Sequence, residues 1–473
     1  VEDPVPKREL WSVGRSRELG ARLALEFRLR PGSPDEDAEP AARSRWNGLY
    51  EYARRHDPYA HDLPPILASL GYRNEVQLAP GDAEAIYPPP LYFSASRIEC
   101  FAACPFRHFA QYALGLEPRA EFVIEAIDFG LLHHKLLEEF YGELIREGRS
   151  LAEIEPDEID SRLSRLAKQW TARLTDEALL GDARNAFLLD RSSRHLREAL
   201  ARQRLMARRG TFRPKAVEWA FGLPRRRGGG AADAGPLELT TPRGRKILIR
   251  GKVDRIDVLE VADECLGVVL DYKRGKERRL PLWKVYHGLD VQLLTYMLAI
   301  IQRGETLAGR PIRPVGAFYV PLTPLRRSVA HPDEAAGTDE SIPPPVKPRG
   351  ILDFGAFKHL DRELESGWSG TYAVFRNRNG ELGNADKNDA CTGPELDRIA
   401  AYARRKIGEL ADRILDGDVA VRPYRVNTRM PCTFCEFRSV CRFDHDVNEP
   451  DEIETIKRDE ALARMGPAEE AAG

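Results

Sequence analysis

Two apolar segments of the sequence each end in an acidic residue, and a lysine lies two residues beyond the second acid. The segments are GKVDRID at 251–257 and LGVVLDYK at 266–273. Alternate side chains of a β-strand share one face, so Asp271 and Lys273 are predicted to point the same way. If the two strands pair, Asp254 joins them, and two carboxylates and one ammonium group converge.

This combination of groups suits the hydrolysis of a phosphodiester. Carboxylates bind hard divalent cations through oxygen, and a bound cation activates water and holds the charged phosphate. The lysine can orient the nucleophile or neutralise developing charge. The alternative is an ordinary solvated strand end, since an aspartate two residues before a lysine also occurs by chance.

The sequence around these residues favours a site. The run LGVVLDYK is continuously apolar, as expected of a strand buried on both faces, and an ionised aspartate at its end is costly unless it is paired or bound to metal. The formal net charge is only −2, but basic segments flank the two acids and together suit a polyanionic substrate. These segments lie at 204–215, 224–227, 243–252 and 273–279.

The cysteines form a second candidate site. The chain has seven, and an odd number argues against a disulfide framework. Cys432, Cys435 and Cys441 have the spacing C-x2-C-x5-C, and a distant Cys100 or Cys104 can supply a fourth ligand. Four thiolates fit either a tetrahedral zinc ion or an iron–sulfur cluster, and the spacing leaves both possible.

Length and composition predict a globular protein. The 473 residues suffice for two or three domains, and 42% hydrophobic with 31% charged residues fits a soluble chain. The apolar run at 291–301 is too short to span a membrane, and the charged N-terminus does not resemble a secretory signal. We therefore expect a cytoplasmic protein with no membrane partner. The first residue is not Met, so we also expect a piece of a longer polypeptide.

Helices and strands are predicted to alternate, which indicates an α/β fold. Apolar periodicity predicts helices at 94–116, 131–145, 290–302 and 395–417, and strands at 216–223, 246–260, 266–273 and 315–320. A loose hairpin tip is expected at 223–237 and a mobile Pro-rich insertion at 322–350. The chain contains no G-x4-G-K-[ST] phosphate loop.

Taken in order, these motifs resemble the C-terminal nuclease region of AddB-type proteins, in the RecB-like branch of the PD-(D/E)XK nucleases. The segments that carry the resemblance are SASRIECFAACPFRHFAQYALGL (94–116), GLLHHKLLE (130–138), GKVDRID, LDYKRG, QLLTY (292–296) and PCTFCEFRSVCRFD (431–444). The resemblance implies a restriction-endonuclease-like α/β core at 91–447, with a mixed central sheet flanked by helices. A helical region at 1–90 would end a motor-free helicase-like part, and 448–473 would be a charged tail.

The resemblance also implies roles for single residues. In the family a histidine follows a glycine by four residues and joins the metal ligands, so Gly130 selects His134 rather than His133. Asp254 and Asp271 match the two metal-binding acids, Lys273 matches the catalytic lysine, and the backbone carbonyl of Tyr272 would be a further ligand. Val253 stands where the superfamily name has proline, a departure that is usual in this branch.

Three more residues complete the expected site. Gln292 and Tyr296 match the family's Q-x3-Y motif, lie one helical turn apart, and are expected to contact DNA or the lysine. Glu218, near the start of the strands, is either an acid that supports the metal ligands or a surface residue of its strand.

The resemblance further implies a 4Fe–4S cluster on Cys104, Cys432, Cys435 and Cys441, with Cys100 left over. The cluster would staple the start of the domain to its end. The implied activity is a DNA exonuclease that depends on Mg²⁺ or Mn²⁺ and acts on the single-stranded end of an unwound duplex. It would work with an AddA-type subunit in double-strand break repair. The alternatives are a non-catalytic DNA-binding scaffold with a structural cluster, and a self-standing iron–sulfur exonuclease of the same superfamily.

Overall fold

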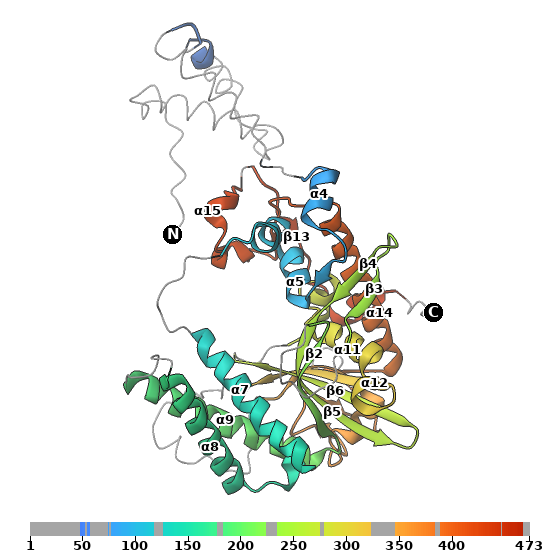
Figure 1. Ribbon diagram of the computed structural model, residues 1–473. Helices are drawn as coiled ribbons and strands as arrows, with labels where there is room; N and C mark the ends of the chain where they lie inside the picture. The colour runs from blue at the N-terminus through green and yellow to red at the C-terminus, as the bar shows by residue number, and fades with distance from the viewer. Residues whose placement is uncertain are drawn as a thin grey trace, which may run out of the picture.

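A six-stranded mixed sheet forms the centre of the protein (Figure 1). The structure, a computed structural model, describes residues 48–52, 54–56, 74, 77–117, 126–176, 183–223, 234–274, 279–322, 346–383, 388–445 and 447–466. The strand order is β11–β8–β7–β6–β5–β2, in which β5 runs antiparallel to β2 and β6, and β6 runs parallel to β7. The strands are β2 (Arg213–Phe221), β5 (Gly251–Val261), β6 (Glu264–Lys273), β7 (Ile312–Pro321), β8 (Arg349–Asp353) and β11 (Ala390–Cys391). The predicted α/β fold with a mixed central sheet is confirmed.

Helices cover both faces of this sheet (Figure 1). One face packs under α7 (Ala126–Glu147), α8 (Pro156–Asp176) and α9 (Ala183–Arg209), and the other under α11 (Gln292–Arg303) and α14 (Gly393–Leu415). Strand β6 contributes to both hydrophobic cores, with Val269 on the α11 side and Val268 and Leu270 on the α7 side. Because strand side chains alternate, Asp271 shares the face of Val269.

A smaller sheet lies next to the central one, on the side where β5 begins. It has the order β1 (Tyr92–Phe93), β4 (Lys246–Ile249) and β3 (Leu237–Thr240). The segment 246–260, predicted to be one strand, divides at Arg250 into β4 and β5, so one stretch of chain joins the two sheets. A Cβ atom at Gly251 would lie 2.7 Å from the Phe221 ring, and this close approach explains the glycine.

The helix predicted at 94–116 is interrupted. It consists of α5 (Ala95–Ala103), α6 (Pro105–His108) and a π-helical turn at Phe109–Ala113. Cys104 lies between the first two with an extended backbone, because Pro105 lacks an N–H group and disfavours helical geometry in the residue before it. None of the helices in the described part of the chain is long and apolar enough to cross a membrane.

The segments flanking the core differ in part from the sequence prediction. Part of the predicted charged tail packs on the core, since α16 (Arg458–Arg464) and the residue after it bury Ala461, Leu462 and Met465. The predicted insertion at 322–350 is shorter, because Leu322 is buried and β8 starts at Arg349. Positions 323–345, 224–233 and most of 1–76 lie outside the described residues.

Candidate active site

The two predicted acids lie where strands β5 and β6 separate. The last paired residues at this end of the ladder are Arg255 and Leu270, so Asp254 and Asp271 come directly after the pairing stops. Both acids are buried. The backbone N–H of Tyr272 donates a hydrogen bond of 2.6 Å to Oδ2 of Asp254, which holds this carboxylate against β6. The tyrosine therefore meets Asp254 through its N–H group, and a ligand role for its carbonyl stays a prediction.

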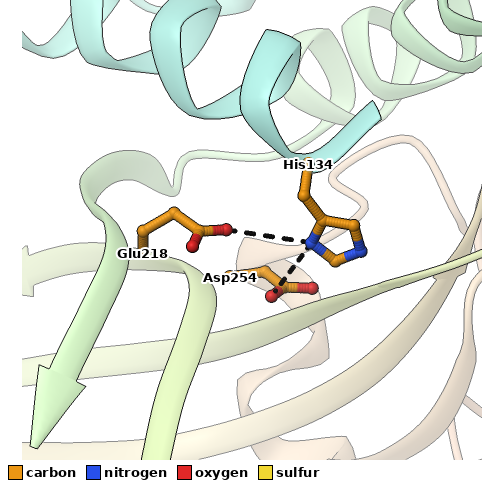
Figure 2. A group of neighbouring side chains, drawn as sticks. All are labelled: His134, Glu218 and Asp254. Atoms are coloured by element: carbon orange, nitrogen blue, oxygen red, sulfur yellow. Dashed lines mark ion pairs between the residues drawn. The ribbon is translucent and has the colours of Figure 1, made fainter. Parts of the chain in front are cut away.

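His134 reaches the same point from α7 (Figure 2). Its Nδ1 atom lies 3.3 Å from Oδ1 of Asp254 and 3.8 Å from Oε1 of Glu218. Within the described residues, these three are the one group of His, Cys, Asp or Glu whose ligand atoms all lie within 4.8 Å of one another. One imidazole nitrogen and two carboxylates, with Asp271 nearby, form a donor set that a divalent cation can bind.

Glu218 has an unusual backbone conformation for a residue inside a strand. Its φ is +50°, in the left-handed region that non-glycine residues rarely adopt. The β2–β5 register pairs Val217 with Arg255 and Trp219 with Val253, which places Glu218 opposite Asp254. Strain of this kind costs about 1–3 kcal/mol and gathers at functional sites. The side chain is 9% exposed, so Glu218 is no surface residue of its strand.

The charges of the site act on one another. Burial would lower the pKa of His134, but the carboxylates of Asp254 and Glu218 outweigh this effect and raise it to about 10. Burial and the negative charge of Asp254 raise the pKa of Asp271 to about 6, against the opposing effect of Lys273. Burial alone would raise the pKa of Glu218, yet His134 and the ion pair with Lys252 lower it. Nearby positive charge therefore favours the ionised forms of Asp271 and Glu218.

Lys273 lies on the α11 side of the site. Its Nζ atom is 2.5 Å from Oδ2 of Asp271 and donates a hydrogen bond of 3.0 Å to Oε1 of Gln292. Gln292 in turn donates through Nε2 to the hydroxyl of Tyr296, also at 3.0 Å. The structure therefore places Gln292 against the lysine and Tyr296 behind Gln292, and this chain of hydrogen bonds fixes the direction of the ammonium group.

A carboxylate from α5 holds the first residue of α11 in place. Oε1 of Glu99 accepts hydrogen bonds from the backbone N–H groups of Val291 (2.8 Å) and Gln292 (3.0 Å). The first N–H groups of a helix have no partner within the helix, and a carboxylate is the favoured partner there. Glu99 thereby connects the segment that carries Cys100 and Cys104 to the contact between Gln292 and Lys273.

Four cysteines line one cavity near α5 and α15 (Arg438–Cys441). They are Cys104, Cys432, Cys435 and Cys441, although about 330 residues separate the first from the rest. The chain segments involved are the start of α6 and the region around α15, which lie at the same end of the molecule (Figure 1). Burial raises the pKa of the Cys104 thiol to about 12, so this thiol needs a bound cation to become a thiolate. A metal group on these four cysteines stays a prediction.

The sequence predicts a role for most of these residues, namely the acids, the lysine, the histidine and the glutamine, and leaves the role of Glu218 open. One signal is present, namely a glutamate within the otherwise apolar segment AVEWAF at 216–221. The backbone conformation that turns it toward His134 has no such signal, because it depends on pairing with β5.

Comparison with known proteins supports the assignment of the fold and gives the family of the chain. The model of the PD-(D/E)XK nuclease superfamily matches residues 92–442. The chain is 31% identical over 477 residues to an ATP-dependent helicase/deoxyribonuclease subunit of Symbiobacterium thermophilum, covering 97% of this chain and 38% of that protein. The proteins of the same name from Moorella thermoacetica and Listeria innocua are 32% and 30% identical, over 85% of this chain and 34% of each relative. The chain thus spans little more than a third of the relatives that it matches.

Proposed function

Because the chain belongs to the PD-(D/E)XK nuclease superfamily, we propose that it is a DNA exonuclease that hydrolyses phosphodiester bonds with Mg²⁺ or Mn²⁺. The observation that carries the proposal is the convergence of His134, Glu218 and Asp254 where β5 and β6 separate. Asp271 and Lys273 lie beside them, at the same ends of the two strands. Because the chain belongs to a nuclease superfamily, we assign this group of side chains to phosphodiester hydrolysis.

Each residue has a part that follows from its contacts. His134, Asp254 and Asp271 would hold the cation, with Glu218 as a fourth candidate ligand. A bound divalent cation polarises the phosphate and lowers the pKa of water. Lys273 contributes a positive charge for the developing negative charge of the phosphate, and Gln292 keeps that ammonium group in one direction. Glu218 and Asp254 hold His134 in one orientation.

A cleavage assay on the 473-residue chain tests this proposal. Single-stranded, end-labelled DNA is incubated with and without Mg²⁺, and products are resolved by length. Asp271→Asn and Lys273→Ala should reduce cleavage by at least about 100-fold, the usual cost of losing charge stabilisation in an active site. The matched controls Asp263→Asn and Lys457→Ala change exposed residues that belong neither to the site nor to the basic segments and should leave the rate unchanged. Full cleavage by Asp271→Asn, or none by the unaltered chain, would leave the non-catalytic scaffold as the better account.

The partner is inferred from the names of the relatives. They are named as subunits of a helicase/deoxyribonuclease, which implies a second subunit. We therefore propose that an AddA-type subunit unwinds the duplex during double-strand break repair and supplies the single strand. The 97% coverage in the first relative includes the N-terminal region, which favours this assignment over a self-standing exonuclease. Duplex DNA should be degraded only when the AddA-type subunit and ATP are both present.

For the cysteines we propose a 4Fe–4S cluster on Cys104, Cys432, Cys435 and Cys441. Four thiolates can bind either a zinc ion or an iron–sulfur cluster, and these four cysteines line one cavity. The resemblance to AddB-type nucleases favours the iron–sulfur cluster. Visible absorption with iron and sulfide analysis decides the matter. Cys104→Ser should lose the colour and Cys100→Ser should keep it, whereas a colourless zinc protein would contradict the proposal.

A further inference from the structure

Arg97, on α5, is a half-buried cation that has no carboxylate partner among the described residues. Its Nε atom donates to Nε2 of His108 (3.0 Å), and its Nη1 atom donates to the carbonyl of Tyr92 (3.1 Å). Both acceptors are neutral. The guanidinium also lies over three aromatic rings, at 4.9, 5.4 and 5.8 Å from the centroids of Phe93, Tyr112 and Tyr87. A buried charge without a counter-charge is costly, so this arrangement is suited to an anionic ligand.

A second arginine that has no carboxylate partner among the described residues lies near the first. Arg250 is exposed at the junction between β4 and β5, and its guanidinium carbon is 5.9 Å from the ring centroid of Tyr92. In the described part of the chain no acid forms an ion pair with it. Burial and the like charge of Arg250 both lower the pKa of Arg97. The two guanidinium groups therefore repel each other, and one negatively charged ligand would relieve both.

Exposed aromatic rings accompany the two cations. Tyr92 and Tyr112 each expose 36% of their surface, and both contact Arg97, one through its carbonyl and one through its ring. A tyrosine ring at the surface next to an arginine offers a flat apolar face beside a positive charge. Bases of single-stranded nucleic acid stack on such rings, while phosphates bind the cations.

This surface lies close to the candidate active site along the chain. Arg250 and Asp254 are four positions apart, so their Cα atoms lie at most about 14 Å apart. Lys252, between them, is paired with Glu218. A strand of nucleic acid that contacts Arg250 would need to extend by only a few nucleotides to bring a phosphate to Asp254.

We propose that Arg97, Arg250, Tyr92 and Tyr112 form a binding surface for single-stranded DNA that leads the strand into the active site. The proposal rests on the proposed function and specifies how the substrate is held outside the reacting centre. Single-stranded rather than duplex DNA is the fitting ligand, because the base faces in a duplex are already stacked on each other and cannot meet Tyr92 or Tyr112. Stacking is possible with every base, so the surface binds without preference for sequence.

The test measures binding rather than cleavage. A fluorescein-labelled oligothymidylate is titrated with the 473-residue chain, without added divalent cation, and fluorescence anisotropy gives the dissociation constant. The variants are Arg250→Ala, Tyr112→Ala and the double variant, since both side chains are exposed or partly exposed and their loss should not disturb the fold. Arg404→Ala and Trp368→Ala remove an exposed arginine and an exposed tryptophan elsewhere on the surface and serve as matched controls. Thermal unfolding midpoints verify that every variant is folded.

We expect Tyr112→Ala to weaken binding about tenfold, the usual cost of losing one stacked base. Arg250→Ala should reduce the slope of log K against log salt by about 0.7, the value for one phosphate contact in single strands. A double variant that binds as tightly as the controls would overturn the inference, as would equal losses for an oligothymidylate and for a duplex of the same length. Because the readout needs no cleavage, failure of the proposed nuclease activity would be seen separately in the Mg²⁺ assay.

Discussion

At position 218 we expect the usual order of stability of a glycine and an alanine substitution to be reversed, because of the backbone conformation of Glu218. In an ordinary strand, glycine is less stable than alanine by about 0.5–1 kcal/mol because it loses more conformational freedom on folding. At position 218, φ is +50°, and left-handed geometry costs an L-residue about 1–2 kcal/mol, whereas glycine adopts it freely. The difference between these two effects makes Glu218→Gly more stable than Glu218→Ala by roughly 0.5–1 kcal/mol. Both variants lose the same contacts with His134 and Lys252, so the comparison isolates the backbone.

Urea unfolding of both variants gives the two free energies. Ala220→Gly is the matched control, because Ala220 lies in the same strand, is paired regularly with Lys252, and has no positive φ. It should lose about 0.5–1 kcal/mol relative to the unaltered chain. If Glu218→Gly proved less stable than Glu218→Ala by this same margin, the strain assigned to this position would be refuted. Both variants of Glu218 should be equally poor in DNA cleavage, since each lacks the carboxylate beside His134.

Two further predictions concern buried ionisable groups. His108 is fully buried, and burial followed by the charge of Arg97 lowers its pKa from 6.5 to about 3. Below pH 6.5 the unfolded state therefore binds a proton that the folded state does not, so this contribution to stability is present above pH 6.5 and is lost as pH falls toward 3. In His108→Phe, the slope of the unfolding free energy against pH, measured by urea titration between about pH 6 and 4, should be smaller by up to about 1.4 kcal/mol per pH unit. An unchanged slope would contradict this prediction. Arg255 is buried and forms an ion pair with Asp257 at 2.8 Å. Arg255→Leu should lower the free energy of unfolding in urea by about 3–5 kcal/mol, because it leaves a buried aspartate unpaired. The double variant Arg255→Leu with Asp257→Leu should recover much of this loss, and a double variant no more stable than the single one would show that the ion pair is not the cause.

The two acids can be placed in strands from the sequence because the pattern of a strand is local. The apolar runs specify buried strands, and the two-residue period puts Lys273 beside Asp271, but the first strand does not end at Asp254, since β5 continues to Val261. His134 is identified only through the resemblance, since a histidine on an amphipathic helix carries no local signal of its partners. Its position depends on how α7 packs against β2, which is a property of the fold.

Other features depend on tertiary structure and are incompletely predicted. The interruption at Cys104 has a signal in Pro105, but the periodic apolar residues on either side favour one helix. The residues after 448 have the composition of a charged tail, whereas Ala461, Leu462 and Met465 form an apolar face that packs on the core. In both places a local irregularity or a short apolar face carries more information than the average composition.

The hydrogen bonds of Glu99 have a consequence for how the protein responds to damage. The same short helix carries the carboxylate that fixes Gln292 and leads directly into Cys104. If the proposed cluster and nuclease activity are present, loss of the cluster would release the end of α5 and, through Glu99, alter the direction in which Lys273 presents its charge. Cleavage would then fall although no residue that holds the cation had been modified.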